Sequence, residues 1–136
     1  LLLEAEKQVD TAARLAGLYG PNRSVILRKF LADEAVIEED GRRILNQIHV
    51  QDAASACLFL AKGKHFGVFN VTDDEPMSQL VCYQGLAKHF NKPLPPTGER
   101  KLSNKRAWTH KSVKNAKLRH LGWKPKFPHF LYALKE

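Results

Sequence analysis

Apolar positions along this chain follow two spacings, which predict strands and helices in turn. The runs 11–18 and 67–71 are short and almost continuously apolar, a composition typical of strands buried on both faces. Apolar residues at helical spacing mark four further segments, 1–9, 25–33, 53–62 and 79–90. Strands alternating with helices in this way predict an α/β fold built on an open parallel sheet.

The segment 14–24 predicts a strand, a tight loop and the start of a helix. Gly20-Pro21-Asn22 ends the apolar run, and Ser24 is a suitable cap for the helix 25–33. In open α/β sheets, ligands bind at the carboxyl ends of strands, where such loops lie. An ordinary strand-to-helix turn would use the same residues, so spacing alone leaves both interpretations open.

Two further local signals predict structure in the middle of the chain. Asp40-Gly41 is typical of a hairpin turn, so the flanking segments 35–37 and 43–46 are expected to pair as a two-stranded ribbon. Asp52 stands where a cap of the helix 53–62 would be. His49 could be an ordinary polar residue with its hydrogen bonds satisfied, and Asp52 could be an ordinary helix cap. The other interpretation is that these residues position a ligand.

Amino-acid composition limits the kinds of protein to which this chain can belong. With 136 residues, 43% hydrophobic and 26% charged, the sequence suits one globular domain, here 1–136, and no apolar run approaches a membrane span. Leu1-Leu2-Leu3 is followed at once by Glu4 and is no signal peptide. Both cysteines, Cys57 and Cys82, lie in apolar helical patterns and are expected to be buried thiols of a cytoplasmic protein. The histidines show no ligand spacing, so no metal site is expected.

Positive charge gathers in one third of the chain. The net charge is +8, and segment 88–126 holds twelve Lys or Arg against one acid, Glu99. Such a segment could bind nucleic acid, steer an anionic substrate, or form an ordinary solvated surface. Few aromatic residues interleave with the charges and no nucleic-acid motif is present, so nucleic-acid binding is not expected.

Four motifs, taken in order, resemble the extended short-chain dehydrogenases/reductases, the NAD-dependent epimerases and dehydratases. They are Arg-x-x-Gly-x-Tyr-Gly-Pro-x-Arg at 14–23, Asn-x-Ile-His-Val-x-Asp at 46–52, Phe-Asn-Val with Asp-Glu-Pro at 69–76, and Leu-Gly-Trp with Lys-Phe-Pro at 121–128. The resemblance covers nearly the whole chain but only the C-terminal half of a family member. It implies the C-terminal part of a Rossmann-like parallel sheet plus a small substrate-binding lobe.

The resemblance also implies site residues. It places three residues beside the nicotinamide ring of NAD or NADP: Leu15, Ala16 and Gly17. It places seven in the substrate cleft: Tyr19, Pro21, Asn22, Arg23, Arg43, Asn46 and His49. The two arginines suit a small anionic substrate, because guanidinium groups bind phosphates and carboxylates in a fork. Many nucleotide-sugar enzymes of the family have Asn where this chain has Gly17 and Arg where it has Leu45, which argues against a nucleotide-diphosphate sugar.

The family's chemical machinery is missing from this sequence. There is no glycine-rich phosphate fingerprint and no Tyr-x-x-x-Lys, and Leu2 stands at the family's lysine position. We therefore expect no catalytic residue here, no tight NAD(P) binding by this chain alone, and activity as an oxidoreductase or isomerase only together with an N-terminal dinucleotide-binding half. Open sheet edges predict a homo-oligomer. The alternatives are a noncatalytic sensor or scaffold of the same fold, or a basic nucleic-acid-binding module.

Overall fold

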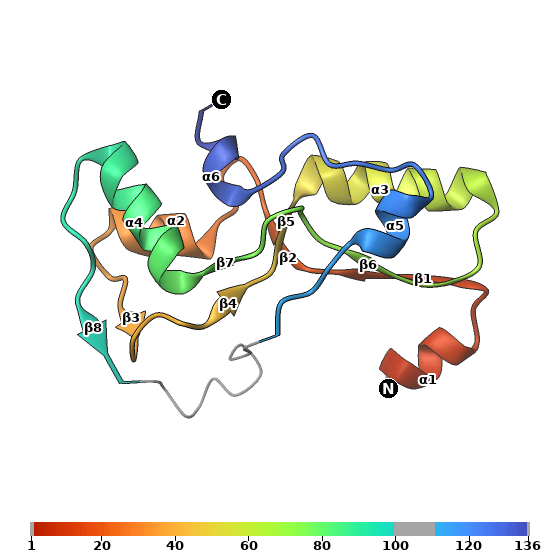
Figure 1. Ribbon diagram of the computed structural model, residues 1–136, viewed down its shortest axis with the longest axis horizontal. Coiled ribbons are helices and arrows are strands. Elements are labelled where there is room, and N and C mark those ends of the chain that lie inside the picture. The colour runs from red at the N-terminus through yellow and green to blue at the C-terminus, as the bar shows by residue number, and fades with distance from the viewer. Residues whose placement is uncertain (1, 100–110, 136) are drawn as a thin grey trace.

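The computed structural model describes residues 2–99 and 111–135 (Figure 1). The helices are α1 (Leu2–Lys7), α2 (Val25–Leu31), α3 (Val50–Gly63), α4 (Gln79–Phe90), α5 (Ala116–His120) and α6 (Phe130–Ala133). The strands are β1 (Thr11–Leu15), β2 (Gly17–Tyr19), β3 (Ile37–Glu38), β4 (Ile44–Leu45), β5 (Gln47–His49), β6 (Gly67–Val71), β7 (Met77–Ser78) and β8 (Thr97–Gly98).

The central strands form a parallel arrangement that forks. β1 pairs with β6, from Thr11 opposite Gly67 to its end at Leu15, and β2 pairs with β5. At the fork the chain changes its hydrogen-bond partner. The Ala16 N–H still donates to Val71 O of β6, whereas the next N–H, of Gly17, donates to Asn46 O. The Asp73 N–H, two residues beyond the end of β6, donates to Gln47 O at the start of β5. β5 therefore begins where β1 and β6 end, as a parallel α/β sheet with a switch point requires.

The predicted strand 11–18 is wrong in two respects. It is two strands broken at Ala16, and β1 is not buried on both faces, because Leu15 is 45% exposed and Arg14 reaches Glu6 at the surface. Within residues 2–99 and 111–135, β1 also has a strand on one edge alone. The predicted strand 67–71 is confirmed as β6.

Two apolar cores lie side by side in the elongated molecule. One packs α3 and α5 against β5 and β6, with Ile48, Ala56, Phe69, Leu118 and Trp123 inside. The other gathers α2, α4 and α6 around Tyr19, Phe30, Tyr83, Leu86 and Phe130. Figure 1 shows the first at the end with α1 and the second at the end with α4. The expected Rossmann-like sheet portion and smaller lobe are both present.

The predicted ribbon of 35–37 with 43–46 is wrong. β3 pairs in parallel with β8, and β4 pairs antiparallel with β7. Asp40-Gly41 does turn the chain, with Gly41 at φ +75°, but Leu80 at the start of α4 occupies the space beside Gly41. The N–H groups of Gln79 and Leu80 donate to the carbonyls of Arg43 and Gly41. The helix start therefore takes the hydrogen bonds that a hairpin partner would have taken.

Helix caps follow the sequence at two helices and depart from it at a third. Ser24 caps α2 as predicted, and Ser78 caps α4; each accepts a hydrogen bond from the N–H three residues on. At α3 the cap is His49, whose Nδ1 accepts from the Gln51 N–H at 3.1 Å. Asp52 lies in the first turn and does not cap the helix. Cys57, expected inside, is exposed, whereas Cys82 is buried.

Candidate functional site

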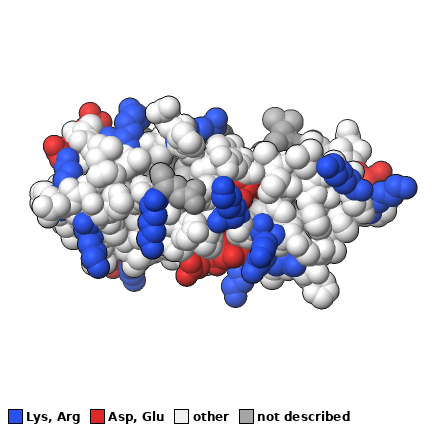
Figure 2. All heavy atoms as spheres, turned by 90° about the horizontal axis from the view of Figure 1, so that it is seen from above, with Lys and Arg blue, Asp and Glu red and all other residues white. Residues whose placement is uncertain are grey.

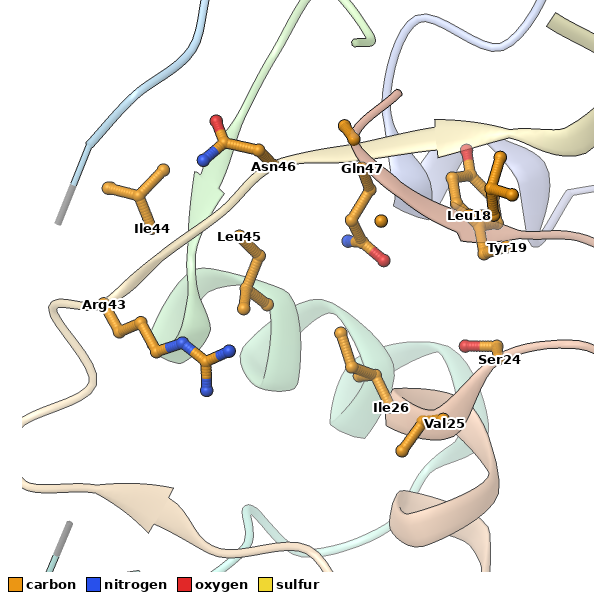
Figure 3. A pocket seen from close by; sticks show the side chains of 12 residues that line it. Leu18, Tyr19, Ser24, Val25, Ile26, Arg43, Ile44, Leu45, Asn46 and Gln47 are labelled. Atoms are coloured by element: carbon orange, nitrogen blue, oxygen red, sulfur yellow. The ribbon is translucent and has the colours of Figure 1, made fainter. Parts of the chain in front are cut away.

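A hollow of about 450 Å³ lies where β2 ends and α2 begins (Figure 3). The residues that line it come from three segments: 16–19, 24–26 and 43–47. The first and third meet because β2 and β5 are parallel neighbours, from Gly17 opposite Gln47 to Tyr19 opposite His49. We call this hollow the cleft.

Arg43 is the cationic side chain of the cleft lining. Its side chain is 20% exposed, and its nearest acidic partner is Glu38, at 3.8 Å between the guanidinium and a carboxylate oxygen. The buried Nε has no hydrogen-bond partner in the part of the chain that the structure describes. Figure 3 shows the side chain extending across the hollow toward Ile26. Because its ion pair with Glu38 is long, the positive charge of Arg43 is only partly compensated, and an anionic group in the cleft would interact with it favourably.

Asn46 also lines the cleft, but its amide already holds the chain together. Its Nδ2 donates to Lys111 O at 2.7 Å, and its Oδ1 accepts from the Val113 N–H at 2.8 Å. Both bonds reach more than sixty residues along the sequence. Asn46 therefore ties the start of β5 to the segment that returns toward α5.

A second hollow, of about 390 Å³, lies on the other side of the Tyr19–Asn22 loop. Four of the predicted substrate residues line it: Tyr19, Pro21, Asn22 and His49. Aromatic rings build its inner wall, since His49 stacks on Phe127 with ring centres 3.9 Å apart, and Tyr19 meets Phe130 edge-on at 4.9 Å. The rings are held by one another and leave this wall rigid.

The predicted site residues thus divide into three groups. Ala16, Gly17, Tyr19, Arg43 and Asn46 meet in the cleft, and Tyr19 joins Pro21, Asn22 and His49 in the second hollow. Two others line neither hollow. Arg23 is exposed and closes a tight turn through mutual backbone hydrogen bonds with Gly20, and Leu15 faces a shallow surface beside α1.

Sequence reasoning missed a buried acidic residue at the carboxyl end of β6. Asp73 is 3% exposed, and burial raises the pKa of its carboxyl to about 7, an effect to which Asp74, Glu75 and Asp52 add while a hydrogen bond from the Glu75 N–H opposes it. Burial likewise raises the pKa of the Tyr19 hydroxyl, and Asp73 and Asp52 raise it further. The available signal was position, because an Asp directly after a predicted buried strand lies where ligands approach such a sheet.

Two small residues, Ala16 and Gly17, form one side of the cleft. A Cβ at residue 17 would lie 3.3 Å from Asn46 O, a close approach that a side chain there would have to relieve by a small shift. Among residues 2–99 and 111–135, no glycine-rich turn opens a helix for a pyrophosphate. The same residues contain no group of three metal-ligating side chains.

Basic side chains are spread over the surface. Figure 2 shows Lys and Arg along the whole length of one face, with a central group beside acidic side chains. Several are engaged locally: Arg119 with Asp74 at 3.5 Å and Lys117 with Val68 O at 2.8 Å. Residues 100–110 of the basic segment lie outside the described residues. None of the described helices is long and apolar enough to cross a membrane.

Comparison with known proteins confirms the resemblance. The chain is 28% identical over 129 residues to a 3-diazoavenalumate denitrifying reductase of Streptomyces sp., covering 85% of this chain and 42% of that protein. Its fold matches a UDP-glucose 4-epimerase of Thermus thermophilus, solved with NAD, with a TM-score of 0.74 and 17% identity over 98% of this chain and 48% of that one. A human epimerase family protein solved with NADPH gives a TM-score of 0.77 and 17% identity over 92% and 46%. The chain spans less than half the length of these proteins, and no family model matches it.

Proposed function

We propose, from the premise that this chain has the fold of the C-terminal half of the NAD-dependent epimerase/dehydratase proteins, that it forms the substrate-binding part of an NAD(P)-dependent enzyme. The substrate is a small anionic, sugar-like or similarly sized molecule. The observation that carries this proposal is Arg43, the cationic side chain of the cleft lining, whose ion pair among the described residues is a long one, 3.8 Å to Glu38.

Each part of the cleft has a physical task in this proposal. Arg43 binds the anionic group of the substrate, because a guanidinium offers several N–H donors in one plane. Tyr19 and Ile26 provide apolar wall, and the low wall at Ala16 and Gly17 admits the nicotinamide ring against the substrate. NAD(P), when bound, exchanges a hydride with the substrate. The phosphates of the cofactor are held by residues outside this chain.

Reduction and epimerisation are both reactions of proteins similar to this chain. The reductase is 28% identical to it, and a UDP-glucose 4-epimerase of Thermotoga maritima is 25% identical over 97% of this chain. Leu45 stands where many nucleotide-sugar enzymes of the family have an arginine, which again favours a smaller anion.

The test compares two neighbouring arginines in a protein that contains this chain together with a dinucleotide-binding half. Arg43→Ala should weaken binding of inorganic phosphate by about 10- to 100-fold, since a hydrogen bond to a charged group contributes about 1.5–3 kcal/mol. Arg42→Ala is the matched control, because Arg42 is exposed and pairs with Asp40. Equal affinities in wild type and Arg43→Ala would refute the anion site.

A noncatalytic sensor of the same fold is the second candidate, favoured by Leu2 at the family's lysine position. It would bind the substrate probe and NAD(P)H with Arg43-dependent affinity but show no turnover of NADPH in a spectrophotometric assay. We do not propose nucleic-acid binding. Titration with mixed-sequence DNA and RNA at about 150 mM salt should show only weak, steeply salt-dependent association, and tight binding that survives added salt would reverse that view.

A further inference from the structure

The C-terminal segment 126–134 crosses the carboxyl ends of the central strands and closes over them. The Asp52 carboxylate accepts the N–H groups of Lys126 and Phe127 at 2.8 and 2.9 Å. Pro128 O accepts from the N–H groups of Asp74 and Glu75 at 3.0 and 3.2 Å. Figure 1 shows this segment passing from α5 beside the start of α3 to α6. We call it the strap.

Beneath the strap, three polar side chains are buried together. Tyr19, Asp52 and Asp73 are each about 3% exposed. The Tyr19 hydroxyl has no hydrogen-bond partner within the described residues and lies in the field of both carboxylates, Asp73 first and Asp52 second. Tyr19 also lines the cleft and contacts Phe130 of the strap, so the cluster joins the strap to the cleft wall.

The charged groups around Asp73 are mostly of its own sign. Asp74 and Glu75 of the same loop and Asp52 of α3 disfavour its ionised form. The nearby bases are engaged elsewhere, since Arg119 pairs with Asp74 at 3.5 Å and His129 with Glu75 at 3.6 Å. The buried His49 accepts the Gln51 N–H and lies between Tyr19 and Phe127 of the strap, with its ring 5.3 and 3.9 Å from theirs.

Two groups can respond to the charge on Asp73. Lys114 lines with Asp73 an open hollow of about 500 Å³ on the far side of the loop. The Tyr19 hydroxyl faces the same cluster from β2 and has a proton to donate.

We propose that the proton on the Asp73 carboxyl is a switch that holds the strap and the Tyr19 wall of the cleft against the strand ends, and that loss of this proton loosens both. This goes beyond the proposed function, because it requires neither cofactor nor substrate. When Asp73 is neutral, the cluster carries one buried negative charge, at Asp52, whose oxygens the strap satisfies. When Asp73 ionises, two buried carboxylates repel each other and the local structure opens to hydrate one of them.

The direction of the pH dependence follows from the linkage between proton binding by Asp73 and opening of the strap. The pKa of Asp73 is raised in the closed arrangement to about 7 and returns toward its ordinary value near 4 when the segment opens. Closing therefore takes up a proton between these values. The opening equilibrium should rise up to about tenfold per pH unit from about pH 4 to 7 and level off above 7.

Hydrogen exchange of the whole protein measures this directly. Peptides covering 124–134 and 17–24 should lose protection from pH 5 to pH 7, by about tenfold or more after correction for the intrinsic exchange rate. Asp73→Asn should keep both peptides protected at pH 7 and flatten the profile. Asp40→Asn is the control with the same charge change, because Asp40 is exposed and pairs only with its neighbour Arg42 within the described residues. That variant should follow the wild type.

Two results would overturn the switch. One is a corrected exchange profile that is flat in the wild type or equally steep in Asp73→Asn. The other needs no variant and so stands even if Asp73→Asn does not fold: a carboxyl carbon titration by NMR that gives Asp73 a pKa below 5. A titration near 7, with exchange unchanged across it, would equally refute the coupling of Asp73 to the strap.

Discussion

The Asp52 carboxylate accepts a hydrogen bond from the backbone N–H of Phe127, 75 residues further along the chain, at 2.9 Å. Its other oxygen accepts from the neighbouring N–H of Lys126. One buried side chain in the first turn of α3 therefore satisfies two backbone donors of the strap, which no helix or strand partner serves.

Replacing Asp52 by Ala should lower the free energy of unfolding by about 3 kcal/mol, because two N–H groups lose a charged acceptor. Asp52→Asn keeps one acceptor oxygen and should lose less. Urea unfolding followed by circular dichroism measures both. Asp40→Ala, at an exposed carboxylate, is the control and should change stability by less than about 0.5 kcal/mol. A loss no larger in Asp52→Ala than in this control would contradict the assignment.

Gly85 should resist the usual gain from a helical alanine. An alanine in the middle of a helix is normally about 1 kcal/mol more stable than glycine, but a Cβ at residue 85 would lie 2.3 Å from Leu131 Cδ1. We expect Gly85→Ala to bring no gain in the wild type and about 1 kcal/mol in a Leu131→Ala background. A double-mutant cycle by thermal unfolding measures the coupling, and equal effects in both backgrounds would show that α6 does not press on α4.

The two thiols should differ sharply in reactivity. Cys57 is exposed, whereas Cys82 is fully buried and burial raises the pKa of its thiol to about 12. Ellman's reagent at pH 8 should label one thiol per native chain quickly and the second only in denaturant. Cys57→Ser should abolish the fast phase. Fast labelling of both thiols in the native protein would mean that the α4 core opens readily.

The bare edge of β1 should drive this chain to self-associate. Within residues 2–99 and 111–135, β1 has a strand on one edge alone, and apolar side chains nearby face solvent, with Leu15 45% and Phe66 70% exposed. Sedimentation velocity at micromolar concentration should show a dimer or larger species. Leu15→Lys should weaken association, whereas Val81→Lys, at an exposed site on α4, should not. A wild type that sediments as a monomer would remove the argument.

Local signals in the sequence predicted local structure well. β6 was found at its observed bounds, and Ser24 and Ser78 cap their helices, because an apolar run and a cap depend on residues close together in the chain. These features need no knowledge of what lies across the fold.

Features set by distant partners could not be predicted in this way. Asp40-Gly41 has the chemistry of a hairpin, yet Leu80 takes the space beside it. Asp52 has the position of a cap, but its hydrogen bonds go to the strap. The pairing of β2 with β5 brings residues 16–19 and 43–47 together in the cleft, whereas Arg23, close in sequence, does not line it. In each example, contacts between segments far apart in the sequence decide where the residue lies.

The fork in the central strands also dictates an order of events during synthesis. β1 meets its partner β6 only after the chain has grown from Thr11 to Gly67, and β2 waits from Gly17 until Gln47 has been made. At about 5–20 residues per second, β1 is made roughly 3–11 s before β6. During that interval its Ala12–Leu15 backbone is unpaired and open to chaperones or to the same segment of a neighbouring nascent chain. Synthesis rate, as well as sequence, thus decides how much of this protein reaches its native pairing.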